Sequence, residues 1–137
     1  MGLTYTDLSL ANARDTSLAP LQARALADKG ALHLCIPQHV AVQLQLEELE
    51  KREVTPADGS RHVLSYVGPV QVRFGNRSGF MGAMVLGDEV LLGTISIEDL
   101  DSVVHPASRA VTVNPLNPNF PASLAKCIRS TPRGYRL

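Results

Sequence analysis

The chain has no tryptophan, and only 4% of its 137 residues are aromatic. Proteins that bind single-stranded nucleic acid stack the bases on aromatic side chains, and the sequence offers little for such a platform. The formal net charge is zero, because 13 basic residues balance 13 acidic ones. Without a basic excess, the sequence predicts no binding to nucleic acid and none to an anionic membrane surface.

Cysteine and long apolar runs are also scarce. Cys35 and Cys127 are too few for a disulfide framework and have no metal-type spacing, so Cys35 is predicted to be an unreactive core thiol. No apolar run is long enough to cross a bilayer. The first residues have neither the basic nor the apolar region of a signal peptide. We therefore expect a protein of the reducing cytoplasm.

The sequence is rich in short apolar segments separated by turn residues. Their alternation predicts strands at residues 4–10, 21–27, 32–36, 70–74, 80–86, 90–92 and 110–113. A hairpin is predicted over residues 54–66, and the charged run at 47–53 is predicted to be a solvated helix end or strand edge. A short helix is predicted at 38–44, because Pro37 suits the first position of a helix, and helical spacing of apolar residues predicts another at 97–104. The length suits one domain, and we expect a mainly β fold, a small closed barrel or sandwich with one or two short helices.

The segment from Ala25 to Pro37 carries the main functional hypothesis. An apolar run leads into Asp28, Lys29 and Gly30, and a second apolar run follows. A carboxylate at the end of a strand suits a reactive acid on a rigid support, and Gly30 permits a tight bend beside it. On these residues alone, an ordinary surface turn is the simpler alternative.

Two ordered motifs resemble those of the retropepsin-like aspartic proteases of clan AA, and among them the small stand-alone enzymes of bacteria. Residues 26–31 are similar to the hydrophobic–Asp–Thr/Ser–Gly–Ala signature, with Asp-Lys-Gly in place of Asp-Thr-Gly. Residues 90–93 are similar to the hydrophobic–hydrophobic–Gly motif, and a helical segment is predicted after them at 96–103. The resemblance implies a protease domain over residues 1–115 and a C-terminal extension over 116–137.

This resemblance implies a homodimeric, retropepsin-like (acid protease) endopeptidase that cleaves peptides or proteins without a metal or an organic cofactor. Because the chain supplies one Asp in a suitable setting, Asp28 of each protomer would form the catalytic dyad, whose two carboxylates share one proton. The other implied site residues are Lys29, Gly30 and Ala31 in the active-site turn, Ala57, Asp58, Gly59 and Ser60 in a flap, and Leu91, Leu92 and Gly93 in the second motif and pocket wall.

Lys29 is the departure from the pattern. Lysine donates hydrogen bonds and accepts none, and an ammonium at the dyad would favour two anionic carboxylates over a shared proton. Three hypotheses remain open: an active protease, a protease impaired by Lys29, and a non-catalytic dimerisation or peptide-binding module of the same fold. A metal enzyme has weak support, because the four histidines are scattered: His33, His39, His62 and His105.

Overall fold

The computed structural model describes residues 3–124, which form nine strands and two short helices. The strands are β1 (Tyr5–Asn12), β2 (Leu21–Ala27), β3 (Leu34–Ile36), β4 (Glu47–Val54), β5 (His62–Phe74), β6 (Arg77–Val85), β7 (Val90–Leu92), β8 (Ser102–His105) and β9 (Ala110–Val113). The helices are α1 (Gln38–Gln43) and α2 (Thr94–Asp99).

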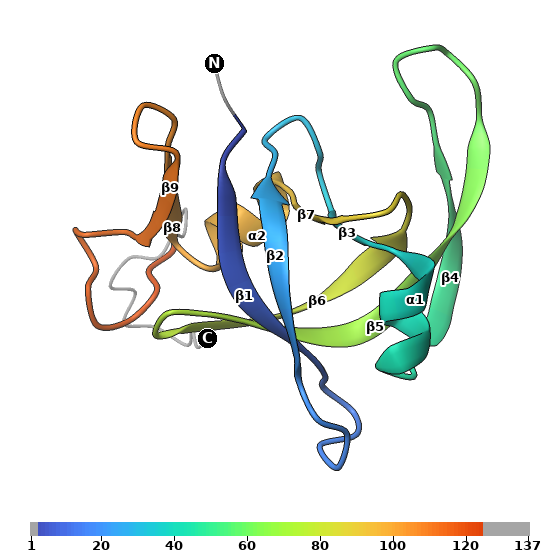
Figure 1. Ribbon diagram of the computed structural model, residues 1–137, viewed down its shortest axis with the longest axis horizontal. Coiled ribbons are helices and arrows are strands. Elements are labelled where there is room, and N and C mark those ends of the chain that lie inside the picture. The colour runs from blue at the N-terminus through green and yellow to red at the C-terminus, as the bar shows by residue number, and fades with distance from the viewer. Residues whose placement is uncertain (1–2, 125–137) are drawn as a thin grey trace, which may run out of the picture.

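Six of the strands close into a barrel (Figure 1). Their hydrogen-bonded order is β1-β2-β7-β3-β6-β5, and β5 pairs back with β1. Alternating side chains fill the interior, among them Leu8 and Leu10 of β1 and Val70 and Val72 of β5. β4 extends the sheet beyond β5, and the two strands form a long hairpin. The predicted fold class, a mainly β closed barrel with short helices, is confirmed.

The barrel contains two parallel strand pairs that lie side by side in the sheet. β2 runs parallel to β7, and β3 runs parallel to β6. α1 follows β3 and α2 follows β7, so a strand–turn–strand–helix unit occurs twice in the chain. Because β2 and β7 are in parallel register, with Ala27 opposite Leu92, the residues that follow both strands emerge at the same edge of the sheet.

The second helix differs from the prediction. It covers residues 94–99 instead of 97–104, and residues 102–105 form strand β8, which pairs with β9. Ile97 and Leu100 are buried, as the helical spacing indicated. Asp101 has a φ of 50°, and this left-handed conformation ends the helix, so Val103 and Val104 continue in a strand.

Several strand bounds also differ from the predicted ones. β1 continues to Asn12, which pairs with Val70 of β5 and donates its side-chain amide to the carbonyls of Leu44 and Gln45 after α1. β3 begins at Leu34, two residues later than predicted, because residues 28–33 form a loop. β6 begins at residue 77, three residues earlier than the strand predicted at 80–86, and the charged run at 47–53 belongs to edge strand β4.

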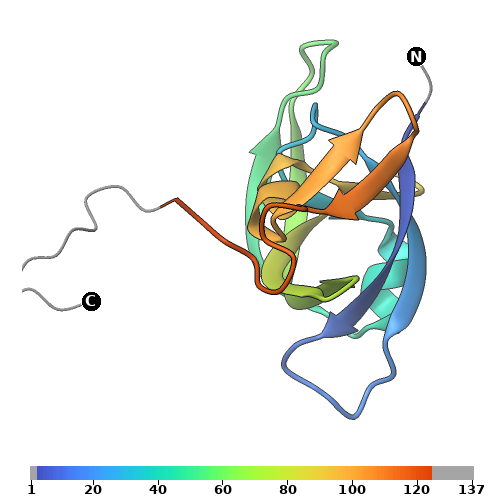
Figure 2. The ribbon, with the colours of Figure 1, turned by 90° about the vertical axis from the view of Figure 1, so that its left-hand side faces the viewer.

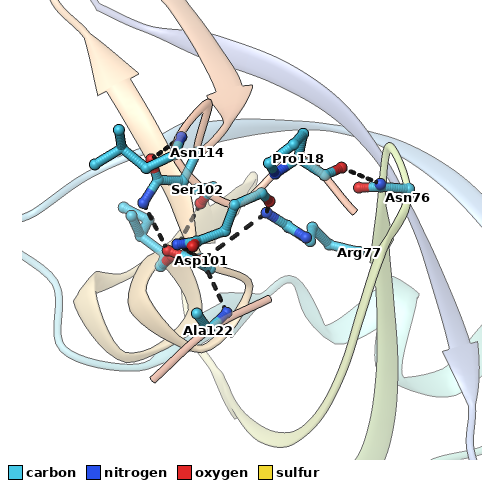
Figure 3. Close-up of polar contacts among 10 residues, drawn as sticks. Asn76, Arg77, Asp101, Ser102, Asn114, Pro118 and Ala122 are labelled. Atoms are coloured by element: carbon cyan, nitrogen blue, oxygen red, sulfur yellow. Dashed lines mark hydrogen bonds and ion pairs between the residues drawn. The ribbon is translucent and has the colours of Figure 1, made fainter. Parts of the chain in front are cut away.

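The β8–β9 hairpin packs against α2 and β1, in front of the barrel in Figure 2. Asp101 ties the segment after β9 to this unit (Figure 3). Its carboxylate accepts hydrogen bonds from the Asn114 amide at 3.0 Å, the Asn117 amide at 2.8 Å and the Ala122 N–H at 2.9 Å. The Asn114 bond first, and then the Ala122 bond, lower the pKa of Asp101. The guanidinium of fully buried Arg77 lies 3.8 Å from the same carboxylate and donates to the Asn117 carbonyl.

We expect Asp101→Ala to destabilise the protein more than Arg77→Met. Within residues 3–124, the Asp101 carboxylate is the acidic group paired with Arg77, and Nε and Nη1 of Arg77 are buried without a hydrogen-bond partner. Removing the carboxylate therefore leaves a buried charge with no counter-charge. Methionine fills similar space without charge, and Arg77→Met should change the free energy of unfolding by no more than about 1 kcal/mol. Urea denaturation of both variants tests this, and a larger loss in Arg77→Met would contradict it.

Candidate active site

Asp28 is the first residue after β2, where the chain leaves the barrel. Its backbone N–H donates to the carbonyl of Leu92, the last residue of β7, at 3.0 Å. This bond continues the parallel pairing of the two strands by one residue, so the acid is attached directly to the barrel wall. Its side chain is half-buried. Asp28 therefore lies at the end of a strand that is hydrogen-bonded within the barrel.

The loop 28–33 is folded by its own hydrogen bonds. The Asp28 Oδ1 atom accepts the Gly30 N–H at 2.8 Å, and the Ala31 N–H donates to the Asp28 carbonyl at 3.1 Å. A Cβ atom at position 30 would lie 3.0 Å from Oδ1, so glycine leaves the carboxylate room to fold back over the turn. Lys29 is exposed at the tip. These bonds fix the direction of the acid and leave its Oδ2 atom without a hydrogen bond among the described residues.

Residues that follow the second motif bind this loop through hydrogen bonds. The Thr94 N–H donates to the Ala31 carbonyl at 2.8 Å, the Ile95 N–H donates to the Leu32 carbonyl at 3.0 Å, and the Thr94 hydroxyl donates to the Lys29 carbonyl at 3.0 Å. Gly93 makes this approach possible, because a Cβ atom there would lie 2.5 Å from the His33 carbonyl oxygen. The structure thus brings the two sequence motifs into direct contact. Leu92 is fully buried in the core, while Leu91 is half-buried.

His33 connects the end of the acid loop to the β4–β5 hairpin. Nη1 of Arg52 lies 3.3 Å from Nε2 of His33, and the rings of His33 and Tyr66 meet edge to face with centroids 5.7 Å apart. The Arg52 guanidinium also lies 4.1 Å from the centroid of the Tyr66 ring. Because arginine only donates, the contact needs an unprotonated Nε2 on His33. Burial, and then the charge of Arg52, lower the pKa of His33.

We expect this contact to make stability fall on mild acidification. The folded-state pKa of His33 lies below its ordinary 6.5, so the unfolded chain binds more protons between the two values. The stabilisation is fully present above pH 6.5 and is lost as the pH falls through the lower pKa. Thermal unfolding between pH 7 and 5 should show a decline that His33→Gln reduces. His39→Gln, at an exposed position on α1, should leave the decline as in the wild type, and an equal effect of both variants would contradict this assignment.

The predicted flap residues form the tip of the β4–β5 hairpin. Asp58 accepts hydrogen bonds from the Ser60 hydroxyl at 2.6 Å and the Ser60 N–H at 2.9 Å, and these bonds lower its pKa. Gly59 has a φ of 83°, a value that favours glycine. The tip is exposed and stands away from the barrel (Figure 1). In the described part of the chain, none of the tip residues forms a hydrogen bond with the Asp28 loop, so a flap role stays a prediction.

A hollow of about 330 Å³ lies beside Asp28, on the side of the β8–β9 hairpin. Leu3, Leu26, Val104 and Pro106 line it with apolar atoms, and Asp28 and Lys29 also belong to its wall. Sequence patterns do not identify Val104 or Pro106 as site residues, because their approach to the acid depends on how β8–β9 packs. Thr94 was missed as well, although a hydroxyl directly after the second motif could have suggested a contact with the acid loop.

Three further findings concern the described residues. No group of three or more His, Cys, Asp or Glu side chains in residues 3–124 is placed to hold a metal ion. Cys35 is a free, buried thiol, and burial, followed by the negative charge of Asp28, raises its pKa. None of the helices within that range combines the length and hydrophobicity needed to span a membrane.

Of the comparisons with known proteins, the one with solved structures identifies the fold. No protein-family model and no curated protein sequence matches the chain. Among solved structures, the chain is similar to the crystal structure of the retroviral protease-like domain of Ddi1 from Leishmania major, with a TM-score of 0.54 and 10% sequence identity. The match covers 84% of this chain and 90% of that one. At this identity the likeness shows the fold alone: the chain has a mainly β, retropepsin-like fold.

Proposed function

We propose that the protein is a homodimeric aspartic endopeptidase whose dyad consists of Asp28 from each protomer. The supporting observation is the placement of Asp28: it follows a barrel strand, and the Gly93 motif holds its loop from behind. Each protomer supplies one carboxylate, and a two-fold axis beside the loop brings the partner's carboxylate next to it. Two carboxylates about 3 Å apart cannot both ionise easily, so the pair holds one proton.

This shared proton gives the two carboxylates different roles. The ionised Asp28 takes a proton from a water molecule, which attacks the peptide carbonyl carbon, while the protonated one donates a hydrogen bond to the carbonyl oxygen. Gly30 has no side chain and Ala31 has only a methyl group, so an extended peptide backbone can approach the acid. The β4–β5 hairpin tip would cover the peptide. The mechanism requires neither a metal nor an organic cofactor, and we place the protein in the cytoplasm.

Peptide cleavage by the full-length protein tests the proposal. Incubation with a mixture of peptides, followed by mass spectrometry, should reveal internal cleavage with an acidic to near-neutral optimum. Asp28→Asn should reduce the rate by about 10³-fold or more, because the dyad loses its base. Asp88→Asn, at an exposed turn, is the matched control and should cleave like the wild type. Equal rates for Asp28→Asn and the wild type would reject the assignment.

The exposed Lys29 favours one alternative, a non-catalytic dimer that binds peptides. An ammonium beside the dyad would keep both carboxylates ionised and prevent the shared proton. This alternative predicts dimerisation and peptide binding that survive Asp28→Asn, with no cleavage by either protein. Fluorescence anisotropy with the same peptides, measured alongside cleavage, separates the two functions.

A further inference from the structure

We propose that, in the dimer, the Lys29 side chain of each protomer enters the hollow beside the partner's Asp28 and forms an ion pair with that carboxylate. The inference rests on the homodimer of the proposed function and adds the contact that holds its centre together. Three features support it: the shape of the hollow, the charges at the loop tip and the face on which both lie.

The hollow suits the side chain of a lysine. It has a volume of about 330 Å³, and its wall combines the apolar residues Leu3, Leu26, Val104 and Pro106 with Asp28. A lysine buries its four-carbon stem along apolar surface and keeps its ammonium at a polar group. The protomer's own Lys29 also lines the hollow but forms no ion pair with Asp28 within residues 3–124, so the carboxylate can pair with a lysine from a second copy.

The charges at the loop tip are self-complementary. Asp28 and Lys29 are neighbours in the chain, and in the described residues neither takes part in an ion pair. The Gly30 N–H donates to Oδ1 of the Asp28 carboxylate, and Oδ2 can accept a hydrogen bond from a donor on a second copy. A two-fold axis beside the tip places Lys29 opposite the partner's Asp28 and Asp28 opposite the partner's Lys29. The charges then alternate around the axis, and the repulsion between like charges is offset.

The surroundings of the tip suit a second copy. The Asp28 loop, the β4–β5 tip and the β8–β9 tip all point to the same side of the molecule, the top of Figures 1 and 2. Leu32, in the loop, is 58% exposed, and Leu3 and Ile95, beside the loop, are 62% and 44% exposed. The Ile95 N–H donates to the Leu32 carbonyl, so these two residues lie next to each other. This face combines apolar surface with a self-complementary charge pair.

The ion pairs define a resting state of the dimer. While Lys29 is bound, both Asp28 carboxylates stay ionised and no proton is shared. A peptide is cleaved only after the two ammonium groups have left the carboxylates. Lys29 is therefore a positioning residue of the dimer interface and a brake on the reaction, rather than a catalytic residue.

Charge reversal and charge exchange test the inference. The dissociation constant of the full-length dimer is measured by analytical ultracentrifugation for the wild type, Lys29→Glu, Asp28→Lys and the double variant Asp28→Lys/Lys29→Asp. Each single variant should raise the dissociation constant about tenfold or more, because four like charges then meet at the axis. The double variant should return it to within about threefold of the wild type. Lys51→Glu, on β4, is the matched control and should leave it unchanged.

Two results would overturn the inference: single variants that dimerise as tightly as the wild type, or a double variant as weak as the singles. A wild-type protein that stays monomeric at every concentration would overturn it as well. The proposed function fails separately. Dimers that depend on Lys29 but cleave no peptide would reject the protease and support the proposed interface. Asp28-dependent cleavage, together with a dissociation constant that charge reversal at Lys29 does not change, would support the protease and reject the interface.

Discussion

The Gly93→Ala variant is expected to lose about 3 kcal/mol or more of its free energy of unfolding, or to fail to fold. An added Cβ atom would lie 2.5 Å from the His33 carbonyl oxygen, 2.8 Å from the Ala31 carbonyl oxygen and 2.8 Å from the Leu32 carbonyl carbon. All three are backbone atoms, so no rotation of a side chain relieves the clash. The Asp28 loop would have to move away from α2 and lose the hydrogen bonds from Thr94 and Ile95.

Gly59→Ala is the matched control for this prediction. Gly59 has a φ of 83° but no atom within 4 Å of the added Cβ position, so its replacement introduces backbone strain without a clash. We expect it to lower the free energy of unfolding by about 1–2 kcal/mol. Urea denaturation, followed by circular dichroism, measures both variants. If Gly93→Ala were no less stable than Gly59→Ala, the close approach of the two motifs would not be a determinant of the fold.

The sequence predicted the parts of the structure that depend on local patterns. Alternating apolar residues marked most barrel strands, and turn residues marked the β4–β5 hairpin. The two motifs at Asp28 and Gly93 can be identified from the sequence alone, because each has a distinctive order of apolar residues and glycine. Their contact itself follows from the parallel pairing of β2 with β7, two strands that are far apart in the chain.

The features that the sequence did not predict depend on distant segments. Arg77 lies between the strands predicted at 70–74 and 80–86, where a charged side chain is usually exposed. It is 1% exposed in the structure, and its guanidinium donates to the Asn117 carbonyl, 40 residues further along the chain. The α2 helix ends early because Asp101 adopts a left-handed conformation, which its hydrogen bonds to Asn114 and Asn117 stabilise. The apolar spacing that predicted a longer helix fits a helix followed by a strand equally well.

The candidate site was predicted in the same uneven way. Asp28 and its turn could be found from the motif, since the signature lies within six residues. The contact of His33 with Arg52 and Tyr66 could not, because Arg52 belongs to a charged run whose usual place is solvent. The wall of the hollow was missed for a similar reason: Val104 was expected on a helix and instead lies in β8.

The Lys29→Thr variant is expected to cleave peptides about tenfold faster than the wild type at neutral pH, or faster still. Replacing the ammonium removes the charge that keeps both Asp28 carboxylates ionised, so the dyad holds its shared proton at higher pH. Threonine can also donate and accept a hydrogen bond at the dimer axis, which lysine cannot. The optimum of the pH–rate profile should move upward in the same variant.

Two further variants separate charge from hydrogen bonding in this prediction. Lys29→Met removes the charge and keeps an apolar stem, so it should show the upward shift of the pH optimum without the added hydroxyl. Lys29→Arg keeps the charge and should behave like the wild type. All rates are compared at protein concentrations at which ultracentrifugation shows each variant to be dimeric, because loss of the ion pair weakens association. An unchanged rate and an unchanged profile in both Lys29→Thr and Lys29→Met would mean that the ammonium of Lys29 stays in solvent, away from the acid pair.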